Sequence, residues 1–177
     1  MKAPTDTPIH DLIATRWSPY AFSDRPVSAD DLRSLFEAAR WAPSSYNEQP
    51  WRFIVGTSAD PATHARVLGC LVEGNQGWAK NVPVLVLGVV SRQFAHNGRD
   101  NRACEHDLGL AVANLSLEAT ARGLCVHQMI GIEPDHARQE FSVPDDHEVL
   151  TAFAIGYADE SAEGELAQRD AERRHAE

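Results

Sequence analysis

The segment Asn101–Arg122 constrains the fold more than any other part of the sequence. It reads as one long helix, for which Gly123 supplies the stop signal. Apolar residues form two stripes along it, the first made of Leu108, Val112, Leu115 and Ala119 and the second of Leu110, Ala113, Leu117 and Ala121. A helix that is apolar around most of its circumference is buried, either inside a core or between subunits. Because a monomer of 177 residues needs less apolar helix than this, we expect the segment to lie at the interface of a homodimer.

Strand and helix signals alternate through the rest of the chain. The run Pro83–Val90 is almost continuously aliphatic, which is typical of a strand buried on both faces. Further strands are predicted at 51–55, closed by Gly56, at 124–129 and at 149–157. Helices are predicted at 5–17, from the capping box Ser28–Asp31 to before Pro43, from Asp60 onward, and from Pro134 to near Phe141. These elements add up to a sheet of about four or five strands with helices between them, in an α/β or α+β fold.

Length and charge limit the number of domains and the classes of partner. We expect a single domain over 1–157, followed by a charged tail over 158–177 that forms an exposed helix. The longest strongly apolar run, Val82–Val90, has nine residues, whereas a membrane span needs about 20. Residues 1–18 have early Asp and Pro and no apolar run, so we expect no secretory signal. Its 16 basic and 26 acidic residues give a net charge of −10, which disfavours nucleic acids and anionic membranes as partners.

Four common motifs are absent from the sequence: a GxGxxG after a strand, a Walker A loop, HExxH and GxSxG. Cys70, Cys104 and Cys125 are widely spaced and odd in number, which favours a reducing, cytoplasmic setting without disulfides or a zinc site. The cluster Cys104–Asp107 lies on a helix, where neighbouring side chains diverge by about 100° and do not converge on one metal ion. Cys125 and His127 share one face of a predicted strand, so a Cys/His nucleophile remains an alternative to ordinary strand packing.

Two other segments carry more chemical information. Arg16 and Ser18 end a predicted helix and offer a guanidinium and a hydroxyl, which suit an anion such as a phosphate. The loop 43–50 holds two Ser, one Asn and one Gln between two prolines. A stiff loop of hydroxyls and amides can hydrogen-bond a flat heterocycle with little loss of entropy.

Taken together, in this order and spacing, these residues resemble the nitroreductase family of FMN-dependent oxidoreductases. The family pattern is an Arg-x-Ser after the first helix, then Pro-Val, then Ala-Pro-Ser-x-x-Asn-x-Gln-Pro-Trp-x-Phe. This chain supplies Arg16 and Ser18, then Pro43, Ser44, Asn47, Gln49, Pro50, Trp51 and Phe53. The resemblance continues in 121–124, 129–131 and 154–157, and so covers about residues 8–157.

The resemblance implies an α+β fold with a mostly antiparallel central sheet flanked by helices. It also implies a homodimer with two FMN sites at its interface. NAD(P)H would reduce the flavin and leave, and a nitroaromatic, a quinone or a similar acceptor would then take the electrons. Flavin N5 would carry this ping-pong hydride chemistry, so no protein residue is expected to be catalytic and no metal is expected. Two alternatives are a non-catalytic flavin-binding protein and another redox reaction on this fold, such as dehydrogenation, dehalogenation or flavin breakdown.

The resemblance also assigns cofactor-binding roles to individual residues. Arg16 and Ser18 would hold the FMN phosphate and ribityl end, and Trp17 would contribute through its backbone. From the other subunit, Pro43, Ser44 and Ser45 would line the flavin, Asn47 would hydrogen-bond its edge, and Gln49 would support the loop. The backbone of Gln128, Met129, Ile130 and Gly131 would approach the ring near N5.

Three departures from the family pattern affect these assignments. Tyr20 stands where many members have a Lys or Arg near the N1/O2 edge of the flavin, and a Tyr could only hydrogen-bond there. Ile130 replaces an acidic residue or Gly, although a backbone N–H would serve with any side chain. The basic C-terminal stretch of the family is shortened, which leaves Arg169, Arg173 and Arg174 as the candidates for its phosphate contact.

Overall fold

The computed structural model of the chain describes residues 2–174, with only the backbone described at position 174. Its helices are α1 Asp11–Thr15, α2 Ala29–Arg40, α3 Pro61–Gly69, α4 Glu73–Ala79, α5 Cys104–Ala121, α6 Pro134–Glu140 and α7 Glu165–Arg174. Its strands are β1 Trp51–Thr57, β2 Val84–Ser91, β3 Cys125–Met129 and β4 His147–Gly156, and a single 3-10 turn, η1, spans Ser45–Asn47. Within the described residues, no helix is both long enough and apolar enough to cross a membrane.

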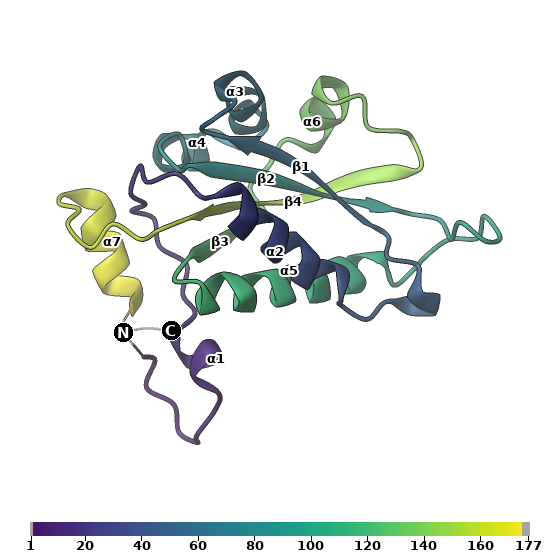
Figure 1. The fold of residues 1–177 in the computed structure, drawn as a ribbon. Helices are drawn as coiled ribbons and strands as arrows, with labels where there is room; N and C mark the ends of the chain where they lie inside the picture. Colours follow the sequence, from purple (N-terminus) through teal and green to yellow (C-terminus); the bar gives the residue numbers. More distant parts are fainter. Residues whose placement is uncertain (1, 175–177) are drawn as a thin grey trace.

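The four strands form one sheet in the order β1-β2-β4-β3, and every neighbouring pair is antiparallel. Helices α2 and α5 cover one face of the sheet, and α3, α4 and α6 cover the other (Figure 1). The central strand β2 is therefore buried on both faces, which explains the aliphatic run in its sequence. This arrangement confirms the α+β fold with an antiparallel sheet flanked by helices.

Helix α5 presents its two apolar stripes to different surroundings. Leu108, Val112, Leu115 and Ala119 of the first stripe are buried against the sheet. In the second stripe, Leu110 and Leu117 are half-buried, and Ala113 and Ala121 are exposed. The core of one chain thus buries the first stripe, takes in Leu110 of the second in part, and leaves Ala113 and Ala121 exposed.

The ends of several elements differ from the sequence prediction. The first helix spans only Asp11–Thr15 and not 5–17, because Pro8 disfavours helical geometry in the residue before it. Strand β1 continues through Gly56 to Thr57. Gly56 does not end the strand, but gives room for α3, since a Cβ there would lie 2.7 Å from the Cα of His64. Helix α4, which was not predicted, is short, contains two glycines and lacks a side-chain cap.

The predicted helix in the tail is present as α7, but the expectation that it is exposed is wrong for its inner face. Asp170 is only 8% exposed, and Leu166 packs against the same apolar layer as Phe22 and Trp78. Helix α7 is thus docked on the chain that precedes it. The division of the sequence into a domain over 1–157 and a tail over 158–177 stays a prediction.

Candidate functional site

The predicted phosphate-binding residues lie directly after α1. Arg16 is the C-cap residue of α1, and its Nη1 donates a hydrogen bond to Oγ of Ser18 at 3.2 Å. Arg16, Trp17 and Ser18 are all half-buried. The structure thus brings the guanidinium and the hydroxyl together, as the Arg-x-Ser pattern predicts.

The ring of Tyr20 lies in the middle of a cluster that connects this segment with α7. Trp78 and His127 pack edge-on against it, with ring centroids 5.3 and 4.7 Å away. The Cζ atoms of Arg169 and Arg173, both on α7, lie 3.9 and 5.2 Å from its centroid. Of the three predicted C-terminal arginines, two therefore lie beside Tyr20, while the side chain of Arg174 is outside the described residues.

The loop 43–49 has an unusual backbone for residues other than glycine. Tyr46, Asn47 and Gln49 have φ values of 55°, 55° and 50°, in the left-handed region. Hydrogen bonds within and beside the loop hold this conformation. The N–H of Gln49 donates to Oγ of Ser44 at 3.0 Å, and Nε2 of Gln49 donates to the carbonyl oxygen of Arg40 at 3.2 Å. Gln49 thus ties the loop to the last turn of α2.

Two carboxylates outside the predicted set anchor the same loop. The backbone N–H of Ser45 donates to Oδ2 of Asp107 on α5 at 3.0 Å. Glu48 accepts a hydrogen bond from the N–H of Ala95 at 2.8 Å, which ties the loop to the β2–α5 connection. Non-glycine residues in the left-handed region are found mainly where the surroundings enforce them, often at functional sites. The loop is therefore a rigid element that displays hydroxyl and amide groups.

The segment 128–131 follows the end of β3 and is shaped by close backbone contacts. The carbonyl oxygen of Met129 accepts a hydrogen bond from Oγ1 of Thr151 at 2.8 Å. Asn75 donates from Nδ2 to the carbonyl oxygen of Gly131 at 3.0 Å. A Cβ at Gly131 would lie 2.6 Å from that Nδ2, so only glycine fits without a shift of Asn75. The side chain of Ile130 points outward and is 86% exposed.

A cavity of about 260 Å³ lies beside this segment. It is lined by Gln128 and Ile130 from the β3 end, by Leu150 and Thr151 from β4, and by Glu105, Leu108, Gly109 and Val112 from α5. The surface is mainly apolar, with a few polar groups at its edge. A flat, partly apolar molecule could lie here against the end of β3.

The two halves of the predicted site lie at opposite ends of α5 in the folded molecule. Helix α7 and the segment 16–20 are at the end where α5 finishes, and the loop 43–49 is at the end where α5 begins (Figure 1). The segment 128–131 lies between the two halves, because His127 just before it contacts Tyr20, whereas Gln128 and Ile130 line a cavity with Glu105 and Gly109 from the beginning of α5. Within a single chain, Arg16 contacts Ser18, and Arg173 lies over the ring of nearby Tyr20, but the loop lies at the other end of α5.

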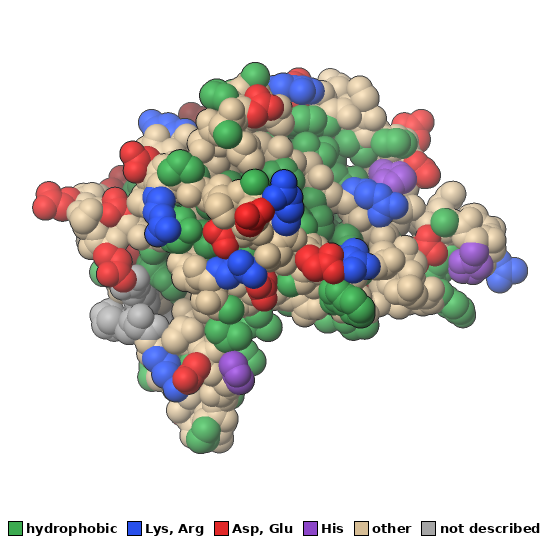
Figure 2. Space-filling model, viewed as in Figure 1, with side chains coloured by type: hydrophobic (Ala, Val, Ile, Leu, Met, Phe, Trp, Pro, Cys, Tyr) green, Lys and Arg blue, Asp and Glu red, His purple; other side chains and the backbone are tan. Residues whose placement is uncertain are grey.

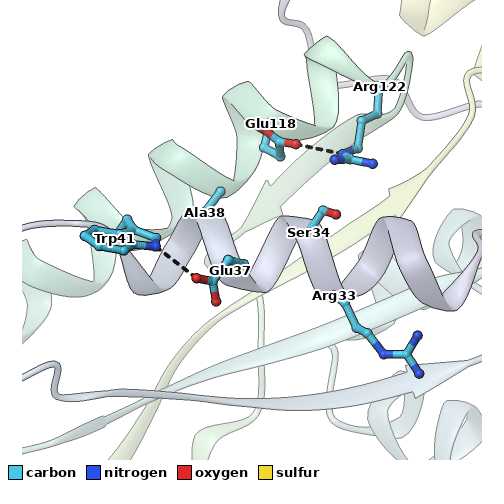
Figure 3. Close-up of a pocket in the computed structure, with 7 residues that line it drawn as sticks. All are labelled: Arg33, Ser34, Glu37, Ala38, Trp41, Glu118 and Arg122. Atoms are coloured by element: carbon cyan, nitrogen blue, oxygen red, sulfur yellow. Dashed lines mark hydrogen bonds and ion pairs between the residues drawn. The ribbon is translucent and has the colours of Figure 1, made fainter.

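A second, larger groove of about 570 Å³ runs between α2 and α5 (Figure 3). None of the predicted cofactor-binding residues lines it. Trp41, 73% exposed, lies at its end and donates from Nε1 to Glu37 at 2.9 Å. Hydrogen bonds from Arg40 and Trp41 lower the pKa of Glu37 to about 2. This ion cluster fixes the last turn of α2, from which the loop 43–49 departs.

Cysteine and metal chemistry find little support among the described residues. Burial raises the pKa of the Cys70 thiol to about 11, so this thiol is protonated at neutral pH. His127, which the sequence offered with Cys125 as an alternative nucleophile, is 6% exposed, and its Nδ1 lies 2.8 Å from the carbonyl oxygen of Pro19. No group of three or more His, Cys, Asp or Glu side chains in the described part could hold a metal ion.

Comparison with known proteins places the chain in a family. The sequence model of the nitroreductase family matches residues 13–157. The chain is 29% identical to a nitrobenzene nitroreductase of Ectopseudomonas oleovorans, over 89% of this chain and 90% of that protein. It is also 33% identical to an uncharacterized 15.4 kDa protein of Mycolicibacterium smegmatis, over 70% and 87% of the two chains.

Solved structures show the same likeness. An oxidoreductase containing FMN superposes with a TM-score of 0.88 at 32% identity, over 95% of this chain and 87% of that chain. A nitroreductase family protein of Clostridium difficile 630 has the same fold, with a TM-score of 0.71 at 24% identity over 86% of each chain. With the family match spanning most of its length, this chain belongs to the nitroreductase family.

Proposed function

We propose that this protein is an FMN-dependent oxidoreductase that uses NAD(P)H to reduce nitroaromatic compounds, quinones or similar acceptors. The observation that carries the proposal is the pairing of Arg16 and Ser18, close in sequence to Tyr20, against which α7 packs, at positions to which the family resemblance assigns the cofactor. The similar oxidoreductase that contains FMN supports the choice of flavin.

The residues present fit the two ends of FMN. Its phosphate is dianionic, and Arg16, Ser18 and Arg173 supply guanidinium and hydroxyl donors around one short segment. Its ring is flat and has hydrogen-bonding groups along one edge. The rigid loop displays Ser44, Ser45 and Asn47, and its fixed backbone keeps the entropic cost of binding low.

The protein's own part in the reaction is to bind and orient. When bound, FMN would supply the hydride chemistry at N5, taking a hydride from NAD(P)H and returning the electrons to the acceptor. The backbone of 128–131 would lie near the reacting edge, where Asn75 holds the carbonyl group of Gly131. The outward side chain of Ile130 and the apolar cavity beside Gln128 would contact the ring or the acceptor. The protein needs no general base in this scheme.

We also propose that two copies complete each site. The loop of one copy would then reach the flavin that Arg16 of the partner binds, through Pro43, Ser44, Ser45 and Asn47. Each site would thus combine the loop end of one copy with the phosphate-binding end of the other. The outer face of the chain supports a dimer. A shallow cavity of about 270 Å³ is lined by Leu12, Ala38, Trp41, Asn114, Leu117 and Glu118, and Ile9 and Ile13 nearby are 42% and 53% exposed.

Figure 2 shows apolar side chains gathered at the lower edge of the molecule, over α1 and beside the end of α2. Surfaces of this kind on a monomer usually mark an interface. The part of the second stripe of α5 that one chain leaves open, with Ala113 and Ala121 exposed and Leu117 half-buried, would be covered there. A cytoplasmic location is part of the proposal and fits the buried free thiols of Cys70 and Cys104.

The test is the visible spectrum of the purified protein, followed by anaerobic titration with NADH and with NADPH. We expect one releasable FMN per subunit, bleaching on titration, and recovery of the flavin spectrum when a nitroaromatic compound or a quinone is added. A colourless protein that fails to take up FMN would contradict the proposal. Flavin that binds but is not reduced would indicate a non-catalytic flavoprotein. Reduced flavin that none of these acceptors reoxidises would indicate another redox reaction.

A further inference from the structure

Asp170 makes an unusual connection between the two ends of the sequence. Its Oδ1 accepts a hydrogen bond from the backbone N–H of Tyr20 at 2.7 Å, and its Oδ2 accepts one from Ala21 at 2.9 Å. The residue is 8% exposed, so the carboxylate is removed from water and has two backbone donors in compensation. Asp170 therefore docks α7 on the segment that directly follows Arg16 and Ser18.

The same docking sets the position of two arginines. Arg169 and Arg173 lie one helical turn apart on α7, with Asp170 between them, and both guanidinium groups lie over the ring of Tyr20. Cations over an aromatic face are attracted by the ring quadrupole. The position of each guanidinium thus depends on where α7 is held and on where Tyr20 is held.

The ring of Tyr20 is itself fixed from within the protein. Trp78 and His127 pack edge-on against it, and the ring of His127 is held through Nδ1 by the carbonyl oxygen of Pro19. Tyr20 is therefore a rigid support, and the carboxylate of Asp170 determines how α7 meets it. This gives Tyr20 a use other than that of the cation that many relatives carry at its position.

We propose that Asp170 is a positioning residue, which holds α7 so that Arg173 and Arg169 face the phosphate subsite formed by Arg16 and Ser18. The docking of α7 and the binding of a phosphate-bearing flavin are then linked. Because linkage is reciprocal, a bound phosphate must stabilise the docked helix as much as the docked helix stabilises the phosphate. This inference rests on the proposed function, since it takes FMN as the ligand.

The first test uses the unaltered protein and trypsin, which cleaves after Arg169 and Arg173. We expect FMN to slow cleavage at these two sites by about tenfold relative to riboflavin at equal saturation, because riboflavin has no phosphate to hold α7. Equal protection by the two ligands would overturn the inference, as would protection by neither. Failure of the wild-type protein to bind either flavin would instead overturn the proposed function.

The second test compares Asp170→Asn with Glu172→Gln by titration of both flavins. The asparagine keeps a single acceptor oxygen, whereas Glu172 is exposed on the same helix and bonds only to Gln168 among the contacts described. Asp170→Asn is expected to raise the Kd for FMN by about tenfold, or 1.4 kcal/mol, and to leave the Kd for riboflavin within about twofold. Glu172→Gln should change neither. If the role of Asp170 is merely structural, Asp170→Asn would raise the Kd for both flavins equally, and that result would refute the assignment.

Discussion

The backbone N–H of Ser45 donates a hydrogen bond to the carboxylate of Asp107, with 3.0 Å between nitrogen and Oδ2. Asp107 is 2% exposed and lies on α5, 62 residues further along the chain. The bond ties the loop 43–49 to the longest helix of the protein. A carboxylate that accepts from a backbone N–H in a buried place makes a stronger contact than a neutral acceptor does.

Removing this carboxylate should loosen the loop. Asp107→Ala is expected to lower the free energy of unfolding by about 1.5–3 kcal/mol, the usual worth of a hydrogen bond to a charged group. The substitution should also weaken the binding of FMN, because the loop would then have to become ordered on binding. Denaturant unfolding and flavin titration measure the two effects. Arg102→Ala, on an exposed side chain just before α5, should change stability by less than about 0.5 kcal/mol. An equal loss in both variants would argue against the anchor.

Arg16→Ala should discriminate between two flavins. Arg16 would act on the phosphate, and the removal of one partner from a desolvated charge pair costs about 2–5 kcal/mol. We therefore expect FMN to bind at least about thirtyfold more weakly. Riboflavin, which lacks the phosphate, should bind the variant and the wild type equally well. Parallel titrations check this, with Arg33→Ala on the exposed face of α2 as the control. An equal loss of both ligands in Arg16→Ala would contradict the phosphate assignment.

Asn47 should behave differently, because we propose that its side chain lies against the flavin ring. Asn47→Gly removes the side chain and tolerates the φ of 55°. It should weaken FMN and riboflavin alike, by about 0.5–1.5 kcal/mol for one neutral hydrogen bond. Asn47→Ala should do the same and also lower the melting temperature, since alanine is strained at this φ. A preference for one flavin over the other in Asn47→Gly would show that the side chain does not contact the shared ring.

Replacement of Gly56 and of Gly77 by alanine should change the stability of the protein in opposite directions. A Cβ at Gly56 would meet the backbone of His64 at 2.7 Å, so β1 or α3 must move, and we expect a loss of about 1–3 kcal/mol. A Cβ at Gly77, inside α4, would have no neighbour within 4 Å. Gly77→Ala should raise stability by about 0.5–1 kcal/mol through helix propensity. Chemical denaturation of both variants is the check, and destabilisation by Gly77→Ala would show that the space around α4 is occupied.

The ion cluster at the end of α2 should make the stability of the protein depend on pH. Hydrogen bonds from Arg40 and Trp41 lower the pKa of Glu37 from 4.5 to about 2. A carboxyl whose pKa is depressed in the folded state stabilises that state above its unfolded pKa. The contribution should therefore be complete above about pH 4.5 and fade as the pH falls towards 2. NMR titration of the Glu37 carboxyl measures this directly, and an ordinary value near 4.5 would show that the cluster does not form in solution.

The sequence predicts best what depends on neighbouring residues. The first stripe of α5 is periodic, and the buried strand β2 is continuous, so both could be assigned from local patterns. The Arg16–Ser18 contact joins residues two positions apart, so it too could be predicted from the local sequence.

Contacts between distant segments were not predictable in this way. Asp107 and Asp170 look like ordinary charged residues on helices, and their roles come from backbone N–H groups 62 and 150 residues away. Helix α4 was missed because its two glycines weaken the helical pattern. Tyr20 departs from the family pattern in sequence, and its contact with Arg169 depends on the position of α7, which local sequence does not show.

The central claim is that one copy supplies the phosphate end of each flavin site and the other copy supplies the loop 43–49. Heterodimers of an Arg16→Ala subunit with an Asn47→Gly subunit test it most directly, through an FMN titration that resolves the two sites. If the sites are shared, both changes fall in one site and the other site is intact, so each heterodimer should have one site of wild-type affinity. If each chain forms its own site, both sites would be weakened and no site of wild-type affinity would remain, which would contradict the account.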